Sequence, residues 1–251
     1  MGRAVAERIA AASDLRLVGG TAREAGEASY GDNRSVPIVS PADAGELVAA
    51  ADVVIDVSSG DALAQMLAAC SAALEGRSLV IGTTGLDADT ERALDALAAR
   101  AAVLVAPNFS IGVNVLLGLV ERAARVLGGD RYDAEIVETH HARKADAPSG
   151  TALALGSALA SGRGERLDVK RTDGRSGVTG ARPAGEIGLH AVRGGGVIGE
   201  HRVLFLGESE RIELAHAALD RGLFADGAVL AARWIAGRPP GRYTMTEVLG
   251  L

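Results

Sequence analysis

Residues 138–153, ETHHARKADAPSGTAL, combine the side-chain types that acid–base chemistry on an anion requires. His140 and His141 end a segment of alternating polar and apolar residues, and Lys144 follows in a loop. Histidine exchanges protons near neutral pH, and lysine supplies either a proton or a positive charge for a carboxylate. Adjacent strand residues point to opposite faces, so both histidines serve one site identically only if the strand has already turned. Taken singly, each histidine also fits a purely structural role in the strand.

A helix start follows directly, at Pro148-Ser149-Gly150-Thr151. The first amides of a helix are free to donate hydrogen bonds, and the helix dipole favours an anion there. A glycine such as Gly150 lets a carboxylate approach the backbone closely. Ser149 also fits the role of a simple N-cap, worth about 1 kcal/mol. The whole segment predicts a site for an anionic substrate that receives a proton.

The first two-fifths of the chain alternate between predicted strands and helices. Strands are expected at residues 15–20, 52–57, 78–81 and 103–105, and helices at 43–50, 61–74 and 87–100. This alternation is typical of a parallel sheet with helices on both faces. The 251 residues are 48% hydrophobic and 23% charged, which is enough apolar material for such a core. We therefore predict a Rossmann-type α/β nucleotide-binding domain.

The pattern changes after residue 108. We expect helices at 111–127 and 149–160, and strands at 132–139, 186–192, 197–206 and 211–217. Consecutive strands indicate an α+β domain with an antiparallel or mixed sheet, whose exposed face suits assembly. We predict that this domain binds the substrate and forms the oligomer. A last helix at 225–236 is expected to pack back on the first domain. The predicted domains are residues 1–107, completed by 221–251, and residues 108–220.

Three loops follow predicted strands of the first domain: Gly19–Arg23, Gly82–Gly85 and Ala106–Ser110. Ligands of doubly wound sheets bind where loops leave the carboxyl ends of the strands. Each loop alone is equally consistent with a plain turn, but the three together favour a dinucleotide-binding rim. Arg23 lies where an arginine accommodates the 2′-phosphate of NADP. The alternative for Arg23 is a surface residue paired with Glu24.

Composition argues against several other classes of protein. The net charge is −6 and aromatic residues make up 3%, which is not typical of a nucleic-acid-binding protein. Cys70 is the single cysteine, and the five histidines show no zinc-ligand spacing, so no metal site is expected. No apolar run reaches the roughly 18–20 residues of a membrane span, and the N-terminus does not resemble a signal peptide. We expect a cytoplasmic protein.

The sequence begins inside a predicted amphipathic helix, Met1–Ala12. A Rossmann sheet normally places its first strand centrally and follows it with a glycine-rich phosphate-binding turn. Neither precedes this helix, so we expect a nucleotide-binding fold that lacks its first strand, either from a mis-assigned start or from a real truncation.

Five segments resemble the 4-hydroxy-tetrahydrodipicolinate reductase family, also called dihydrodipicolinate reductases. They occur in family order along nearly the whole chain: GTTG at 82–85, APNFSIGVNV at 106–115, ETHHARKADAPSGTALALG at 138–156, GEIGLHAVRGGGVIGEH at 185–201 and FADGAVLAARW at 224–234. The HH-x-x-K-x-D-x-PSGTA stretch is the most specific of them. The resemblance implies reduction of 4-hydroxy-tetrahydrodipicolinate, a cyclic dicarboxylate, to tetrahydrodipicolinate with NADPH or NADH, in the diaminopimelate route to lysine.

The resemblance also implies roles for individual residues. His140 resembles the catalytic proton donor or acceptor, and Lys144 the second proton donor. Implied substrate contacts are His141, Gly150 and Thr151. Implied cofactor contacts are Arg23, Gly82, Thr83, Thr84, Ala106, Pro107, Asn108 and Phe109. Family members are homotetramers joined through the sheets of their substrate domains, and their two domains close over the ligands.

Two departures from the family bear on these implications. Met1 and Gly2 resemble the end of the family's glycine-rich turn, so a weakly active or inactive relative with impaired cofactor binding is the alternative. Ala22 stands where some relatives carry an acidic residue, which favours NADPH. A different Rossmann dehydrogenase is a third hypothesis, but no catalytic cysteine lies near a histidine. The sequence leaves open the NADPH preference and whether His140 or Lys144 delivers the proton.

Overall fold

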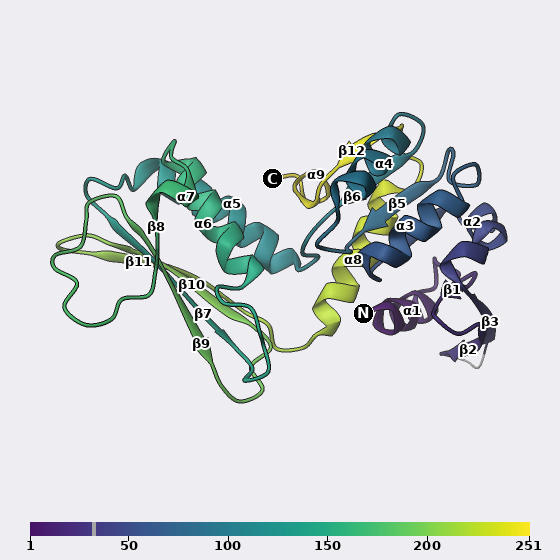
Figure 1. The fold of residues 1–251 in the computed structure, drawn as a ribbon, viewed down its shortest axis with the longest axis horizontal. Coiled ribbons are helices and arrows are strands. Elements are labelled where there is room, and N and C mark those ends of the chain that lie inside the picture. Colours follow the sequence, from purple (N-terminus) through teal and green to yellow (C-terminus); the bar gives the residue numbers. More distant parts are fainter. Residues whose placement is uncertain (32–33) are drawn as a thin grey trace. The chain divides into compact units, whose positions relative to one another are not determined.

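The computed structural model describes residues 1–31 and 34–251, which form two compact units (Figure 1). Unit 1 comprises Met1–Ser110 and Gly222–Gly250. Unit 2 comprises Ile111–Arg221 together with Leu251. The crossing from one unit to the next occurs at the start of the long helix predicted from residue 111.

Unit 1 is built on a parallel sheet with the strand order β12-β6-β5-β4. Its strands are β4 (Val53–Asp56), β5 (Ser78–Ile81), β6 (Ala102–Val105) and β12 (Gly241–Tyr243). Helices cover both faces: α3 (Gly60–Ala69) and α4 (Ala88–Ala98) on one, and α1 (Gly2–Ala11), α8 (Gly222–Ile235) and α9 (Met245–Leu249) on the other.

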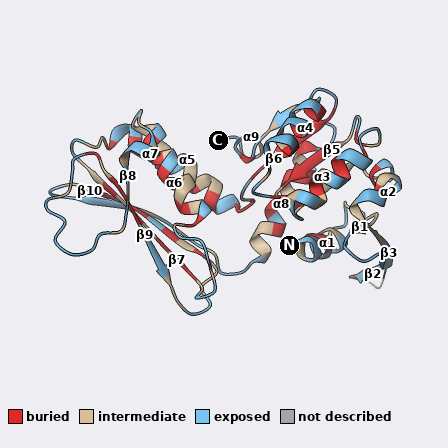
Figure 2. Cartoon of the chain, viewed as in Figure 1, coloured by how far each residue is buried: buried red, intermediate tan, exposed pale blue. Residues whose placement is uncertain are grey.

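The two cores of unit 1 follow from alternation along the strands. On β5, Leu79 and Ile81 pack with α3 and α4, whereas Val80 packs with α8. All three are fully buried, and Figure 2 shows buried residues concentrated on this sheet and on the inner sides of its helices. A parallel sheet buried on both faces reads as a near-continuous apolar run, as β5 does. The predicted α/β architecture is confirmed.

A second, small sheet of unit 1 has the order β1-β3-β2. Its strands are β1 (Gly20–Thr21), β2 (Gly26–Tyr30) and β3 (Arg34–Val39), and the 3-10 turn η1 (Pro41–Asp43) and helix α2 (Gly45–Ala50) follow them. The prediction of a buried strand at residues 15–20 is wrong over most of its length, because only Gly20 joins a ladder and the segment is half-buried. The β2–β3 pair was not predicted, since β2 has few apolar residues, both strands are partly exposed and β3 contains Pro37.

Unit 2 contains a five-stranded sheet with the order β11-β10-β7-β9-β8. The sheet is mixed, as expected, but the short strand β8 was not predicted from the sequence. Its strands are β7 (Asp133–His140), β8 (Arg171–Asp173), β9 (Ile187–Arg193), β10 (Glu200–Leu206) and β11 (Arg211–Ala217). Helices α5 (Ile111–Val126) and α6 (Gly150–Gly162) cover one face, and α7 (Leu167–Lys170) follows α6. On β7, every second residue from Ala134 to His140 is buried toward the helices, so Glu138 and His140 share the covered face.

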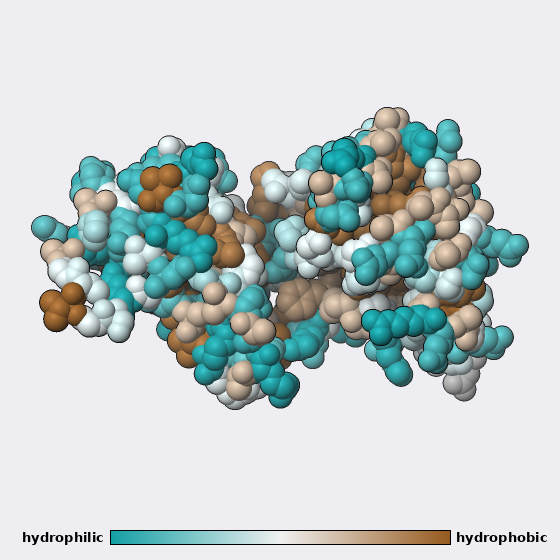
Figure 3. Space-filling view, viewed as in Figure 1, coloured by the Kyte–Doolittle hydropathy of each residue, from teal (hydrophilic) through white to brown (hydrophobic). Residues whose placement is uncertain are grey.

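No helix in the described residues is both long enough and apolar enough to cross a membrane. On the face shown in Figure 3, hydrophobic side chains occur in small groups among hydrophilic ones in each unit.

Candidate functional site

The carboxyl end of β7 carries a buried histidine bonded to a buried carboxylate. Nδ1 of His140 lies 2.5 Å from Oε2 of Glu138, two residues earlier on the same strand. The His140 side chain is 11% exposed and the Glu138 side chain 0%. An ionised carboxylate only accepts hydrogen bonds, so Nδ1 carries the proton and Nε2 is left as the ring atom that exchanges one.

Glu138 accepts hydrogen bonds from three residues: His140, Arg193 and Ser149. Both of its oxygens accept hydrogen bonds from Arg193 on β9, at 2.8 and 2.7 Å. Oε1 also accepts from the backbone N–H of Ser149, at 3.0 Å. Burial tends to raise the pKa of Glu138, but the hydrogen bonds from Arg193, His140 and Ser149 outweigh it and lower that pKa. Glu138 is therefore an anion in the folded protein at neutral pH.

Two further histidines line the same covered face, on β10 and β11. His201 is 3% exposed and meets His140 edge-to-face, with ring centroids 5.2 Å apart. Its Nε2 lies 3.3 Å from Oγ of Ser149, and its cross-strand neighbour is His216. Burial, followed by the charge of His140, lowers the pKa of His201 to about 4. Neither residue was predicted from the sequence as part of the site, although the GEH at 199–201 falls inside a segment that carried the resemblance.

Gly199 lies close to the imidazole of His140. A Cβ built on Gly199 would lie 3.0 Å from Nε2 of His140 and 3.7 Å from Cε1 of His201. The free ring nitrogen of His140 thus faces a position where the chain carries no side chain.

The loop after β7 is held at both ends and presents Lys144. The N–H of Ala142 donates to the carbonyl of Gly195 at 3.2 Å, and Arg193 donates to the carbonyl of Asp146 at 2.7 Å. Nζ of Lys144 lies 2.8 Å from Oδ1 of Asp146, and the Lys144 side chain is 21% exposed. The hydrogen bond from Lys144 lowers the pKa of Asp146. Lys144 is therefore a cation already paired with one carboxylate.

His141 turns away from the Glu138 contact. Its Nδ1 is buried without a hydrogen-bond partner among residues 1–31 and 34–251. Burial, with the nearby positive charge of Arg143 and Arg221, lowers the pKa of His141. The structure thus separates the two adjacent histidines into different surroundings, as their opposite faces on the strand predicted.

The start of α6 combines an N-cap with an exposed glycine. Oγ of Ser149 accepts from the N–H of Ala152 at 3.2 Å, so Ser149 does act as the N-cap. Gly150 is exposed, and a Cβ there would meet no atom within 4 Å. Thr151 is the next helical residue. This 13-residue helix therefore begins at an exposed glycine next to Ser149, whose N–H binds Glu138, and the start of a helix favours an anion.

In unit 1, two of the three predicted cofactor loops, those after β5 and β6, meet at the carboxyl ends of neighbouring strands. A Cβ on Gly82 would lie 2.4 Å from Cε2 of Phe109, so the loop after β5 touches the loop after β6. Phe109 is 4% exposed and belongs to the core, whereas Thr84 and Pro107 are exposed. Ala106 is buried and Asn108 is half-buried, with its Oδ1 accepting from the N–H of Ser110 at 2.8 Å.

Asp56, at the end of β4, ties a third loop to this edge. Its carboxylate accepts hydrogen bonds from the hydroxyl of Thr83 and, at 2.9 Å, from the hydroxyl of Ser58. Asp56 is 8% exposed and Thr83 is 6% exposed. Asp56 was not predicted as a site residue, because a polar residue at a strand end gives no signal in the sequence without its partners.

Arg23 lies apart from these loops in the contacts of the structure. It is exposed, two residues beyond β1, and makes no ion pair with any described residue. The predicted alternative, a pair with Glu24, is therefore not formed. Its guanidinium is available to an anionic ligand.

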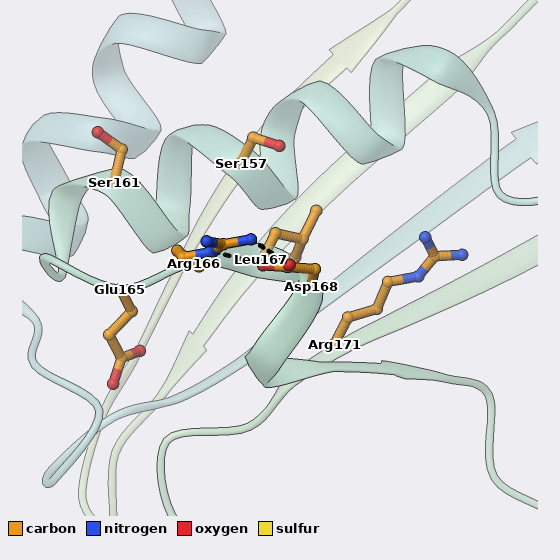
Figure 4. A pocket seen from close by; sticks show the side chains of 7 residues that line it. All are labelled: Ser157, Ser161, Glu165, Arg166, Leu167, Asp168 and Arg171. Carbon is orange, nitrogen blue, oxygen red and sulfur yellow. Dashed lines mark hydrogen bonds and ion pairs between the residues drawn. The ribbon is translucent and has the colours of Figure 1, made fainter.

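Other clusters and hollows do not coincide with these residues. Among residues 1–31 and 34–251, no group of histidine, cysteine, aspartate and glutamate side chains is arranged to hold a metal ion. Figure 4 shows a hollow beside α6 and α7, lined by Ser157, Ser161, Glu165, Arg166, Leu167, Asp168 and Arg171. Because Arg166 is paired with Asp168, and none of the predicted site residues reaches this hollow, it is not a candidate for the same chemistry.

Comparisons with known proteins cover almost the whole chain. The family "Dihydrodipicolinate reductase, N-terminus" matches residues 1–109, and "Dihydrodipicolinate reductase, C-terminus" matches residues 112–249. The 4-hydroxy-tetrahydrodipicolinate reductase of Caulobacter vibrioides is 47% identical over 100% of this chain and 93% of its own length. The reductase of the same name from Granulibacter bethesdensis is 46% identical over 96% of this chain and 90% of its own.

A solved structure agrees with the fold. Dipicolinate-bound dihydrodipicolinate reductase from Paenisporosarcina sp. TG-14 matches with a TM-score of 0.70 at 24% identity, over 98% of this chain and 94% of that one. The Rossmann-type unit and the acid–base cluster define an oxidoreductase that uses a pyridine nucleotide. The chain belongs to the dihydrodipicolinate reductase family, which confirms the resemblance seen in its sequence.

The low pKa of His201 predicts a loss of stability in acid. An unfolded histidine has its ordinary pKa of 6.5, whereas His201 in the folded protein has a pKa of about 4. The stabilisation from keeping His201 neutral is thus complete above pH 6.5 and is lost as the pH falls toward 4. Between these pH values, we expect the free energy of unfolding of His201→Gln to fall by about 3 kcal/mol less than that of the wild type. Urea unfolding followed by circular dichroism at pH 7 and pH 4 measures the difference, and equal losses would contradict the assignment.

Proposed function

We propose that this chain reduces 4-hydroxy-tetrahydrodipicolinate to tetrahydrodipicolinate with NADPH or NADH, in the diaminopimelate route to lysine. The observation that carries the proposal is the set of hydrogen bonds around the buried Glu138 carboxylate, which we call the Glu138 cluster. In it, one carboxylate binds both the imidazole of His140 and the N–H of Ser149 at the start of α6. Membership of the reductase family supports it, as does the name of relatives 46% to 47% identical. Unit 1 is proposed to hold the nucleotide and unit 2 the substrate.

The residues of unit 1 suit a nicotinamide nucleotide. Small and hydroxyl residues end β5 and β6, which lets a ligand approach the backbone, and Asp56 fixes the hydroxyl of Thr83. Gly82 and Phe109 pack against each other and would form the base of the site, with Thr84 and Pro107 at its exposed rim. When bound, the reduced nicotinamide supplies the hydride.

The residues of unit 2 suit a small dianion that gains a proton. The amides of Gly150 and Thr151 would bind one substrate carboxylate, and Lys144 would neutralise it. Loss of the 4-hydroxyl as water leaves a conjugated, electron-poor ring. Addition of hydride at the ring's C4 then needs one proton nearby, which His140 or Lys144 would donate. Hydride and proton together account for the two hydrogens that the product gains.

The first test replaces the two proton-exchanging residues. His140→Gln and Lys144→Ala should each lower kcat by about 10²–10⁴-fold, the range expected for losing an acid–base group. The affinity for NADPH, measured by fluorescence titration, should stay within a few-fold of the wild type. Lys170→Ala is the matched control, because Lys170 is the only other lysine and pairs with Glu165 away from the cluster.

Two outcomes of that test would count against the proposal. A wild-type chain that oxidises no NADPH with freshly made substrate would remove the reductase function. Equal losses of cofactor affinity in both variants would remove the assigned roles of His140 and Lys144.

We propose that Arg23 recognises the 2′-phosphate of NADPH. Its side chain is exposed and unpaired among the described residues, and a guanidinium forms forked hydrogen bonds with phosphate. Arg23→Ala should weaken NADPH binding by about tenfold or more and leave NADH binding nearly unchanged. Arg16→Ala, also exposed and earlier in the same segment, is the control. An unchanged preference in fluorescence titrations of both nucleotides would exclude Arg23 from the site.

We further propose a homotetramer joined through the helix-free face of the unit 2 sheet. This face carries apolar side chains such as Val192, which is 48% exposed, and a hollow that Leu204 lines. Light scattering should give a mass four times the 25.5 kDa of one chain, and Leu204→Glu should reduce that mass. Val169→Glu, on exposed α7, is the control and should keep the assembly. A monomeric wild type would contradict this proposal.

A further inference from the structure

We propose that Glu138 is a positioning residue of the reaction: its buried carboxylate holds His140 with the proton on Nδ1 and links the ring to the start of α6. This inference rests on the proposed function, because it assumes that His140 exchanges a proton with the substrate. Glu138 itself is placed behind the imidazole and is not expected to touch the substrate.

Burial and hydrogen bonding show how strongly Glu138 is held. Its side chain has no exposed surface, and a buried charge is stable only when it is fully paired. Arg193 supplies a two-pronged ion pair from the neighbouring strand, at 2.7 and 2.8 Å. Each carboxylate oxygen has one further donor: Nδ1–H of His140 on Oε2 and the amide of Ser149 on Oε1. No oxygen of Glu138 is left for another partner, so its orientation is fixed.

The fixed carboxylate selects one tautomer of His140. Because an ionised carboxylate accepts and cannot donate, Nδ1 must carry a proton whether the ring is neutral or charged. Nε2 then faces the space at Gly199, where a Cβ would lie 3.0 Å away. The proton that leaves or joins the ring therefore does so at Nε2. In neutral His140 the opposite tautomer would place a proton at Nε2 and remove its capacity to accept one.

The Glu138 carboxylate also fixes the distance between the imidazole of His140 and the first residues of α6. Oε1 holds the N–H of Ser149, the residue immediately before Gly150 on α6. A shift of β7 would thus move the imidazole and the first amides of α6 together. Such coupling suits a substrate whose carboxylate and protonated carbon belong to one rigid ring, because misplacement of about 1 Å lowers turnover strongly.

The groups around His140 come from every element packed against it. They are Glu138 on β7, Arg193 on β9, His201 on β10, His216 beyond it on β11, and His141 and Lys144 in the following loop. Among them Glu138 is the only anion bonded to the ring in the described residues. Its charge therefore opposes the cations that would otherwise disfavour a protonated imidazole.

The substitution Glu138→Gln tests this role with little change of shape. Arg193 and Ser149 donate hydrogen bonds and would take the single carbonyl oxygen, which turns the amide NH₂ toward Nδ1 of His140. We expect neutral His140 to change to the tautomer protonated on Nε2. Long-range ¹H–¹⁵N spectra of histidine-labelled protein report the tautomer, and the five histidines are few enough to assign His140 by comparison with His140→Gln.

The kinetic readout should agree with the spectrum. In Glu138→Gln we expect kcat to fall by about 10²–10⁴-fold while NADPH affinity changes less than threefold. The alkaline limb of the kcat/KM profile should move to lower pH, because a protonated imidazole loses its neighbouring anion. Glu135→Gln is the matched control. Glu135 also lies on β7 and pairs with two arginines, Arg175 and Arg182, but it points to the opposite face of the sheet. It should leave the tautomer of His140 unchanged.

The outcomes separate this inference from the proposed function. Wild-type kcat together with an unchanged tautomer in folded Glu138→Gln would overturn the positioning role while leaving the reductase function intact. A changed tautomer in a protein whose wild type has no reductase activity would instead overturn the proposed function. If Glu138→Gln does not fold, Glu138→Asp keeps the charge but withdraws it by one methylene, and kcat should fall at least tenfold. Wild-type kcat in folded Glu138→Asp would also overturn the inference.

Discussion

An ionised carboxylate inside a protein core has to be paired on both oxygens, and the Glu138 side chain, which has no exposed surface, imposes that requirement on unit 2. It is met by Arg193 from β9, His140 from β7 and the amide before α6. Three elements, β7, β9 and α6, are therefore fixed against one another at the carboxyl end of β7. The loop that carries Lys144 is held between two of them, which determines where its cation can lie.

A similar arrangement occurs at the sheet of unit 1. Asp56 at the end of β4 binds the hydroxyls of Ser58 and Thr83, so that the loops after β4 and β5 share one buried carboxylate. The loop after β6 reaches the same edge through the contact of Phe109 with Gly82. Parallel strands end at one edge, and polar residues placed there can bind a ligand without disturbing the apolar layers beneath. In both units the core supplies rigidity and the strand ends supply chemistry.

Much of the fold could be predicted from periodicity. The ranges of β5 and β11 agree with the predicted strands, and α5 and α6 agree within two residues at each end. The apolar residues of these elements recur at the spacing of a strand or a helix, and this spacing can be read from the local sequence. The β2–β3 pair was missed because both strands are short and β2 has few apolar residues. The pair is held by its own ladder and by the pairing of β3 with β1. Strand pairing between such segments leaves little trace in the sequence.

The site could be predicted only where its residues are adjacent in the chain. His140, Lys144 and Gly150 stand within eleven residues, so their spacing already indicated acid–base work on an anion. Arg193 and His201 lie more than fifty residues further on, and only the folded sheet brings them to β7. Glu138 was visible in the motif, but its importance follows from burial, which sequence does not report.

The proposed chemistry requires a dicarboxylate to bind beside His140 and the start of α6. A crystal structure with pyridine-2,6-dicarboxylate and NADPH would test this directly. We predict one ligand carboxylate within about 3 Å of the Gly150 and Thr151 amides, with Nε2 of His140 facing the ring. A ligand bound elsewhere, with His140 and the start of α6 directed to separate regions, would contradict it.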